Sequence, residues 1–453
     1  MASFNLLLML PDSKNERVLA CKGGNGLPSY TELVGENVAF DEPQMYNNYF
    51  REITGIPVYR RYTFNTPNYV VFVFEQANRD NVIPRNGFDW VSYDDFMAAN
   101  CDEVNKIAKS VSLHYNLSKN MPWVNAKGFT PYFAWLNSVC EKNGIRINGE
   151  IVQLKNAYVS TVLCAPTDMG NVYMKIPGKL YIAELSFTSE LRKLGIADLP
   201  GWIDFDLNMN VVLMKDMGGN DLPNQSDIDT LKVVILQYAQ IQKDSILHLP
   251  LNFEHYDNTI AAILDKLDTF PQKSFEMLKG TQYEISKDEL AKLSDHITTA
   301  AALLKSINHI PVPDTIHHGD VRPGNIRVVD GNYIFYDWSW GAISHPFIEI
   351  VSFLHIIRRT LPNESAKEML IDSYLQEWLS YGTLNDLKYA FSTLSVLKDL
   401  FFALVDYDWV EAIKRSSNES IDFMSADGWL LERRNYYFAN VLRRFIKAPL
   451  AVK

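Results

Sequence analysis

Short apolar runs separated by turns fill the first hundred residues of the chain. The candidate strands, with alternating or fully apolar patterns, are residues 5–11, 17–23, 69–76 and 88–96. Residues 42–56 instead have the apolar spacing of a helix, and Gly55 predicts its end because glycine readily adopts the left-handed conformation that closes helices. We therefore predict a small α+β domain over residues 1–100 and a helical linker region over residues 101–149.

Strand patterns return over residues 150–219, with one helical segment at residues 181–195 among them. The candidate strands are residues 150–166, 171–177, 202–207 and 210–219. The last of them ends in the glycine pair Gly218 and Gly219, which predicts a hinge. Residues 150–219 are thus expected to form a strand-rich lobe that ends at this hinge.

Helical spacing dominates residues 220–453. Ser226 and Ser286 are predicted N-caps, and Ser286 with Glu289 has the pattern of a capping box. One polar stretch, residues 317–341, interrupts the helices with a predicted strand pair. The second lobe is therefore expected to be helical and to carry a polar hairpin.

Composition narrows the classes of function. The chain has 453 residues, of which 47% are hydrophobic, and a net charge of -11. A general nucleic-acid binder would need a basic face, and no window approaches the roughly 20 apolar residues of a membrane span. The four cysteines form no CxxC pair and are expected to be free thiols. We expect a cytoplasmic protein without nucleic-acid or membrane partners.

Hard oxygen ligands and a candidate base lie close together in the polar stretch. "HGDVRPGN" places Asp320 and Asn325 five residues apart, and the next strand ends at Asp337. Phosphoryl transfer needs a metal clamp, positioned phosphates and a carboxylate near the attacking hydroxyl. Asp320 suits the last role, and Asn325 with Asp337 suits Mg²⁺. The structural alternative is that Asp320 and Asn325 only cap turns.

A lysine within an apolar strand of the first lobe completes this chemistry. Lys175, in "VYMKIP", is a candidate to bridge the α- and β-phosphates, and it needs an anionic partner. The following helix offers Glu184 and Glu190, of which the helical register favours Glu184. Lys175 could instead protect an edge strand from pairing.

"HGDVRPGN" and "YDWSWGAISHPFIEI" resemble the catalytic loop and metal-binding segment of the aminoglycoside phosphotransferase and choline kinase-like family. The resemblance covers roughly residues 150–450 and implies a bilobal protein-kinase-like fold, with an N-lobe at 150–219 and a C-lobe at 220–453. It further implies that Asp320 is the catalytic base, that Asn325 and Asp337 bind Mg²⁺, and that Lys175 pairs with Glu184. The backbone near Met214 to Asp216 would receive adenine.

The chain departs from the family's pattern at three places. Arg322 stands where a histidine is frequent, so it either contacts the γ-phosphate or is simply solvated. The loop "KNAYVSTV" has no glycine, which leaves Ser160 and backbone amides to cap the phosphates. Glu349 stands where an aspartate is common.

The first hundred residues resemble a Nudix-type domain in "LPSYTELVGENVAFDEPQMYNNYFREITGIPV" and the strands after it. Arg51, Glu52 and Gly55 are kept, but the glutamate pair of the metal box is missing. Since metal-dependent hydrolysis needs clustered carboxylates, we expect a degenerate, non-catalytic Nudix-like unit.

The sequence is compatible with three functions. The first is a small-molecule kinase that uses Mg²⁺ and either ATP or GTP to phosphorylate a hydroxyl of an aminoglycoside-like antibiotic, a sugar or an amino alcohol. The second is a nucleotide-binding pseudokinase scaffold, and the third is a pyrophosphohydrolase. Asp406, Asp408 and Glu411 form either a solvated acidic face or an amine-binding wall, and with the acidic net charge they favour a cationic acceptor. The tryptophans Trp338 and Trp340 are expected to pack rather than to bind substrate.

Overall fold

The computed structural model has an α+β architecture with two compact units. It describes residues 5–12, 14, 16–21, 26–27, 29–30, 43–65, 69–77, 83–85, 87–113, 118, 120–125, 127–157, 159–181, 183–195, 199–249, 256–416 and 426–451. The first unit comprises Met1–Leu180, Trp202–Asp216 and Ala412–Arg433. The second comprises Tyr181–Gly201, Met217–Glu411 and Arg434–Lys453. The predicted limit at 149/150 therefore falls inside the first unit, whereas the one at 219/220 lies near a division.

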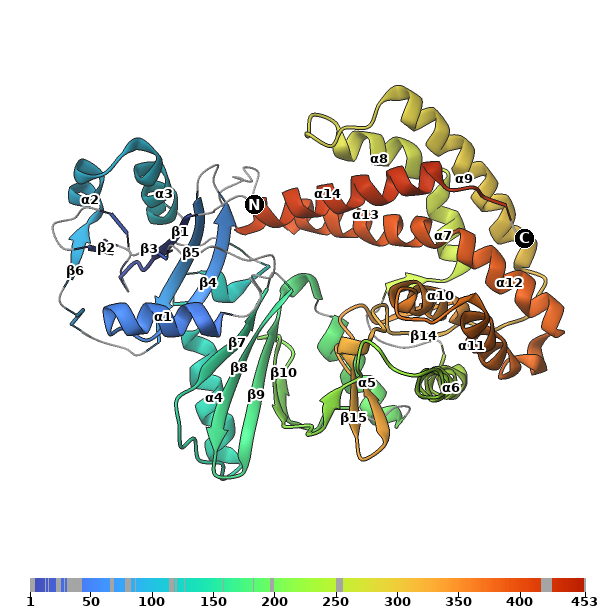
Figure 1. Cartoon of the computed structure of the whole chain (residues 1–453), viewed down its shortest axis with the longest axis horizontal. Helices are drawn as coiled ribbons and strands as arrows, with labels where there is room; N and C mark the ends of the chain where they lie inside the picture. The colour runs from blue at the N-terminus through green and yellow to red at the C-terminus, as the bar shows by residue number, and fades with distance from the viewer. Residues whose placement is uncertain are drawn as a thin grey trace. The chain divides into compact units, whose positions relative to one another are not determined.

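The N-terminal part of the first unit is a mixed sheet covered by one helix (Figure 1). The sheet has the order β3-β1-β5-β4, with β1 parallel to β5. A separate antiparallel pair joins β2 to β6, which are far apart in the sequence. The elements are β1 (Asn5–Met9), β2 (Arg17–Cys21), β3 (Ser29–Tyr30), α1 (Gln44–Thr54), β4 (Val58–Asn65), β5 (Tyr69–Gln76), β6 (Phe88–Ser92), α2 (Tyr93–Ala99) and α3 (Asp102–Leu113).

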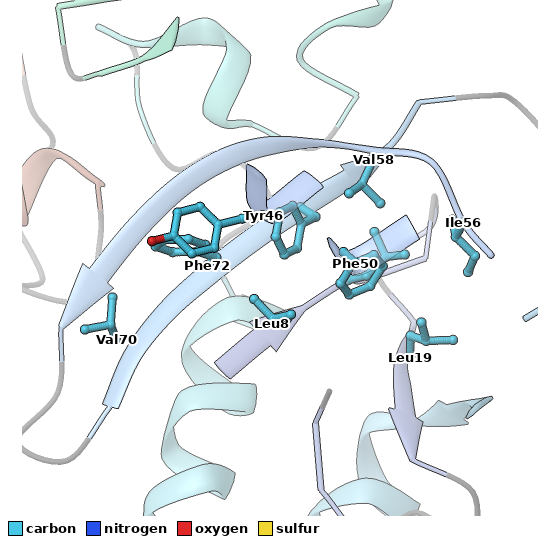
Figure 2. Close-up of a cluster of buried hydrophobic side chains, with 10 residues drawn as sticks. Leu8, Leu19, Tyr46, Phe50, Ile56, Val58, Val70 and Phe72 are labelled. Carbon is cyan, nitrogen blue, oxygen red and sulfur yellow. The ribbon is translucent and has the colours of Figure 1, made fainter. Parts of the chain in front are cut away.

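The core of this part lies between α1 and the sheet (Figure 2). The rings of Tyr46 of α1 and Phe72 of β5 meet edge to face at 4.6 Å, and Phe50 of α1 packs on Phe74 of β5 at 4.9 Å. As predicted, α1 ends at Gly55, which has φ 77° and donates its N–H to Arg51 O. The hydrophobic spacing of the helix therefore places its apolar side on the sheet.

Two features of this region differ from the sequence predictions. Residues 93–96 were expected to extend a strand, but Ser92 accepts the N–H of Asp95 and starts α2 instead. Strand β4 was not predicted, because its sequence, "VYRRYTFN", lacks simple alternation of apolar and polar residues. The other predicted strands of this region are present as β1, β2 and β5, within the residues described.

The second sheet of the first unit is antiparallel, with the order β10-β11-β9-β8-β7. Its strands are β7 (Val152–Asn156), β8 (Ser160–Thr167), β9 (Gly170–Pro177), β10 (Trp202–Asp206) and β11 (Val211–Lys215), preceded along the chain by α4 (Thr130–Lys142). The predicted long strand at 150–166 is in fact the two strands β7 and β8 of a hairpin. Lys175 lies on β9, opposite Val162 on one side and Val212 on the other.

A buried amide joins the two sheets of the first unit. Gln153 of β7 accepts the N–H of Arg60 at 2.8 Å and donates to Arg60 O at 2.9 Å, so it pairs with the backbone of β4. Asn47 of α1 also donates to Gln153 at 3.2 Å, and Asn156 donates to Arg60 O at 2.8 Å. The side chains of Gln153 and Arg60 are almost fully buried. The N-terminal sheet is thus tied to the second sheet by specific hydrogen bonds.

The second unit is mainly helical, as predicted (Figure 1). Its helices are α5 (Ala183–Leu194), α6 (Ile228–Ser245), α7 (Ile260–Leu267), α8 (Phe270–Leu278), α9 (Lys287–Ile307), α10 (Pro346–Ile357), α11 (Glu364–Gln376) and α12 (Leu384–Val396). Helices α13 (Lys398–Ser416) and α14 (Ala426–Lys447) pass through the division between the units. Ser286 caps α9 in a capping box with Glu289, as predicted. The N-cap of α6 is Asp227 rather than Ser226, because the Asp227 side chain accepts the N–H of Thr230.

Two small sheets interrupt these helices. One has the order β12-β15-β16 and contains β12 (Asn220–Asp221), β15 (Ile326–Val329) and β16 (Asn332–Phe335). The other has the order β13-β17-β14 and contains β13 (Tyr256–Asn258), β14 (Thr315–His317) and β17 (Ala342–Ser344). Asp330 and Gly331 form the two-residue turn between β15 and β16, both with positive φ, which is the geometry that Asp-Gly favours. The predicted strand pair of the polar stretch is therefore confirmed.

Candidate active site

The loop between β14 and β15 is held by one buried carboxylate. Glu349, in the first turn of α10, accepts the backbone N–H groups of His318 and Gly319, each at 2.8 Å, and that of Val321 at 3.3 Å. Tyr238 also donates to Glu349, at 3.2 Å. Because three successive parts of the loop donate to one side chain, Glu349 fixes the path of the loop up to residue 321.

Electrostatics keep this carboxylate ionised. Burial opposes its ionisation, but His317, His318 and the N–H groups of Gly319 and Val321 outweigh that effect and lower the pKa of Glu349. Nδ1 of His317 lies 3.0 Å from the Glu349 carboxylate, and burial lowers the pKa of His317. Glu349 is therefore a charged acceptor, and hydrogen bonds to such acceptors are stronger than neutral ones.

Asp320 projects from the braced loop together with its two neighbours. Its Oδ2 accepts a hydrogen bond from Nδ2 of Asn325 at 2.9 Å and from Nε of Arg322 at 3.0 Å. The side chain of Asp320 is 34% exposed and that of Arg322 is 46% exposed, so solvent or a ligand reaches both. Burial raises the pKa of Asp320, against the opposing charges of Arg322 and His318, and Asp337 adds to the rise. A raised pKa makes this carboxylate a better proton acceptor.

Asp337 follows the hairpin and lies near the same group. Asn325 immediately precedes β15, and its C=O accepts the N–H of Tyr336, the residue before Asp337. Asp337 has φ 67°, a conformation that residues other than glycine rarely adopt and that clusters at functional sites. The hairpin register thus brings Asp320, Asn325 and Asp337 together, as the sequence predicted.

Ser339 links the end of the hairpin to helix α5. Its hydroxyl contacts the carboxylate of Asp337 and lies 3.1 Å from that of Glu184 in the first turn of α5. The rings of Phe187 and Trp338 stack at 5.9 Å, and Trp338 meets His318 at 4.5 Å. Trp338 is thus a packing residue, as predicted, whereas nothing in the sequence pattern indicated the role of Ser339.

The competing partner for Lys175 is engaged elsewhere. Glu190 pairs with Lys193 on the same helix at 2.5 Å. Glu184 is buried and lies beside Ser339. The pairing of Lys175 with Glu184 stays a prediction.

The remaining predicted residues lie in the first unit. Lys175 and Ser160 are both buried in the second sheet. Met214 is paired within β11, whereas Asp216 follows the end of that strand and accepts a hydrogen bond from Tyr173. Among the described residues, the buried Oγ of Ser160 has no hydrogen-bond partner, which ordinarily costs about 1–3 kcal/mol. A buried hydroxyl without a partner is suited to form its hydrogen bond with a bound ligand.

The oxygen atoms at this site suit a metal ion that is bound together with a phosphate-containing ligand. No group of three or more His, Cys, Asp and Glu side chains in the described part of the chain is arranged to hold an ion by itself. Mg²⁺ usually takes only one or two carboxylates and completes its shell with water and phosphate oxygens. Asp337 and Asn325 offer hard oxygen atoms of this type, so they suit Mg²⁺ bound together with a nucleotide.

Two of the three acids in the α13 cluster form ion pairs within the protein. Asp406 pairs with Arg434 at 3.0 Å and Asp408 pairs with Lys266 at 2.9 Å. Glu411 accepts a hydrogen bond from Tyr407 at 3.1 Å. The cluster is therefore neither a purely solvated face nor an open amine-binding wall, and the charge of the acceptor stays a prediction.

In the N-terminal unit, Glu52 is exposed on α1. Its neighbour Arg51 forms a surface ion pair with Glu150. The Nudix-like character and the lack of catalysis stay predictions. The four cysteines are free, as expected, and no helix in the described part of the chain is both long and apolar enough to cross a membrane.

No protein-family model matches the sequence, and no curated protein matches it. The fold is similar to that of a choline kinase from Cryptosporidium parvum, with 13% identity and a TM-score of 0.46 over 70% of this chain and 96% of that one. It is also similar to a Plasmodium vivax ethanolamine kinase, with 14% identity and a TM-score of 0.46 over 76% and 97% of the two chains. A macrolide 2'-phosphotransferase type I follows, with 13% identity and a TM-score of 0.43 over 70% and 97%. Likenesses at this level do not assign the chain to a family, so the residues themselves have to support a function.

Proposed function

We propose that the protein is a kinase that transfers the γ-phosphate of ATP or GTP to a hydroxyl of a small molecule. One observation carries the proposal. A solvent-reachable aspartate, Asp320, shares hydrogen bonds with Asn325 and is electrostatically coupled to Asp337, on a loop that a buried carboxylate braces. The protein-kinase-like fold, with its two lobes, is part of the same proposal.

Each residue has a defined task in this reaction. The acceptor oxygen attacks the γ-phosphorus, the bond to the bridging oxygen of the nucleotide breaks, and the hydroxyl proton passes to Asp320. Asn325 and Asp337 would hold Mg²⁺, which offsets the charge of the phosphate oxygens when it is bound. Arg322, now paired with Asp320, carries a cation suited to the γ-phosphate.

The residues of the first unit are proposed to bind the nucleotide. Lys175 is assigned to the α- and β-phosphates, with Glu184 as its partner. Ser160, whose buried hydroxyl has no partner among the described residues, is assigned to phosphate as well. The backbone from Met214 to Asp216 is assigned to the base.

Two isosteric substitutions separate these tasks. Asp320→Asn should preserve nucleotide affinity and lower turnover by ~10²–10⁴-fold, because it removes the proton acceptor. Asp337→Asn should weaken nucleotide binding that depends on Mg²⁺. A screen of hydroxylated compounds with Mg-ATP and Mg-GTP, followed by mass spectrometry, identifies the acceptor, and affinity is measured with and without Mg²⁺.

Asp330→Asn is a matched control. Asp330 lies in the same hairpin but at its exposed turn, where asparagine tolerates the positive φ. Wild-type turnover in Asp320→Asn would contradict the mechanism, and a nucleotide-binding scaffold would then be the better proposal. For the N-terminal unit we propose no chemistry of its own, and hydrolysis of nucleoside diphosphate derivatives that disappears in Glu52→Gln would overturn that.

A further inference from the structure

Two tryptophans and an ion pair form a small cluster beside the candidate base. The rings of Trp340 and Trp409 lie 4.7 Å apart. The guanidinium of Arg434, on α14, lies 4.2 Å from the ring of Trp409 and 5.8 Å from that of Trp340. Its Nη1 donates to Asp406 on α13 at 3.0 Å. We call these four residues the tryptophan–arginine cluster.

The cluster adjoins the residue that precedes Asp320. A Cβ atom on Gly319 would lie 2.4 Å from Cβ of Trp340 and 2.9 Å from its carbonyl oxygen, so the two backbones are in direct contact. Gly319 also has φ 82°, so this position requires glycine for two reasons. Trp340 is partly exposed, whereas Trp409 is buried. The cluster is therefore joined through Trp340 to the residue before Asp320, the residue that would meet an acceptor hydroxyl.

Aromatic faces and a carboxylate are the groups that recognise an organic cation. Here the cation is already present, because the side chain of Arg434 is only 9% exposed and pairs with an Asp406 side chain that is 14% exposed. A second cation at the same rings would have to displace Arg434 and leave its charge buried without Asp406, which is strongly unfavourable. The nearby Asp408 also pairs with a basic residue, Lys266, although both of these side chains are about two-fifths exposed.

We propose that Arg434 sets the specificity of the acceptor site by occupying the cation position with a group of the protein itself. This proposal rests on the proposed phosphotransfer and deepens it. Of the three acceptor classes that the sequence left open, it selects a sugar-like hydroxyl compound without an ammonium group. It reverses the expectation of a cationic acceptor, which was based on the acidic net charge and on three acids of α13, two of which form ion pairs within the protein.

The first test measures binding and requires no turnover. Tetramethylammonium chloride is titrated calorimetrically into the full chain, against a sodium chloride blank. The wild type should show no binding, whereas Arg434→Ala, which opens the rings and leaves Asp406 unpaired, should bind at least about tenfold more tightly. Adding Asp406→Asn to that variant should abolish most of the gain.

Arg443→Ala is the matched control. Arg443 lies on the same helix and pairs with a carboxylate, that of Glu289 at 2.9 Å, away from the tryptophans. It should leave the wild-type result unchanged. Wild-type binding as tight as that of Arg434→Ala, or a folded Arg434→Ala that does not bind, overturns the proposal.

The second test uses the unmodified protein and does not depend on the folding of a variant. Choline and its uncharged isostere 3,3-dimethylbutan-1-ol are compared as acceptors with Mg-ATP. The isostere should be phosphorylated at least as fast as choline, and a clear preference for choline overturns the proposal. If neither is phosphorylated, wild-type binding of tetramethylammonium decides: millimolar affinity overturns the proposal and its absence supports it. Loss of phosphotransfer to every acceptor would instead refute the proposed function and leave the binding result standing.

Discussion

Two buried polar groups organise the two units of this protein, and they differ in where their hydrogen bonds lead. Within the described residues, the hydrogen bonds of Gln153 in the first unit lead to other buried groups, and its side chain and that of Arg60 are almost completely hidden. Glu349 in the second unit is equally buried, but the loop that it holds ends in Asp320 and Arg322, which are open to solvent. The hydrogen bonds of Gln153 therefore join two sheets inside the core, whereas those of Glu349 position reactive side chains at the surface.

Removal of Glu349 should have the largest effect. Glu349→Ala removes the acceptor of the Gly319 and Val321 N–H groups and of the Tyr238 hydroxyl, and it leaves the His318 N–H with Tyr238 alone, so we expect a loss of roughly 3–5 kcal/mol in the free energy of unfolding. Urea unfolding followed by circular dichroism measures it. Glu364→Ala is the matched control, since Glu364 also lies in the first turn of a helix but is exposed. Equal stability of the two variants would show that the carboxylate does not brace the loop.

Gln153→Ala should destabilise the protein without a direct effect on the site. The N–H of Arg60 loses its side-chain acceptor, whereas its C=O keeps the hydrogen bond from Asn156, so we expect a loss of roughly 1–3 kcal/mol. We expect the nucleotide affinity of the folded fraction to stay at the wild-type value. Gln240→Ala is the control, because Gln240 is exposed and bonds only to Asp244 in the described structure. If the nucleotide affinity of Gln153→Ala fell by more than its folded fraction explains, Gln153 would also affect the site, and the contrast with Glu349 would be wrong.

The buried carboxyl group of Glu75 predicts that the stability of the first unit depends on pH. Burial raises the pKa of this carboxyl from 4.5 to about 7, although Arg61 and the N–H groups of residues 127–129 oppose the shift. The folded state therefore holds its proton more tightly than the unfolded state, so stability is lost as pH rises from about 4.5 to about 7. The full shift corresponds to about 3 kcal/mol, and partial exposure reduces the expected change to roughly 1–2 kcal/mol.

Glu75→Gln tests this sign. The variant should lose that part of the slope and gain stability relative to the wild type at pH 8, as measured by urea unfolding at pH 5 and pH 8. The exposed Glu141→Gln should follow the wild-type curve. A steeper loss of stability in Glu75→Gln would mean that the ionised carboxylate is favoured at the start of α4.

The smallest effects should separate two serines that look alike in the sequence. Ser286→Ala removes the N-cap of α9 and should cost ~1 kcal/mol. Ser226→Ala should cost less than ~0.5 kcal/mol, because Asp227 caps α6 instead. Thermal unfolding of both variants measures the difference, and a reversed order would contradict the assignment of the caps.

Sequence rules that depend on a few neighbouring residues predicted much of the fold correctly. Gly55 ended α1 and Ser286 started α9 as expected, because a cap depends on a few neighbouring residues. The same rules failed where two possible N-cap residues are adjacent in the sequence, as with Ser226 and Asp227. They also failed for β4, since Arg60 and Arg61 are buried there by partners from distant parts of the chain.

The candidate site was predictable where its residues are close in sequence. Asp320, Asn325 and Asp337 belong to one loop and hairpin, so spacing alone indicated that they meet. The pairing of Asp406 with Arg434, and the contact of Ser339 with Glu184, depend on helix packing that spacing does not encode. Glu349 was noticed only as a departure from a pattern, because nothing local marks it as the acceptor of three N–H groups.

The bracing by Glu349 has a consequence for how the protein exchanges hydrogen with water. Amide protons in loops ordinarily exchange quickly, because local opening costs little free energy. The amides of His318, Gly319 and Val321 are bonded to a fully buried carboxylate in the first turn of α10. They should therefore exchange at the slow rate of core helices, so that an isotopic label would mark this loop as part of the folding core.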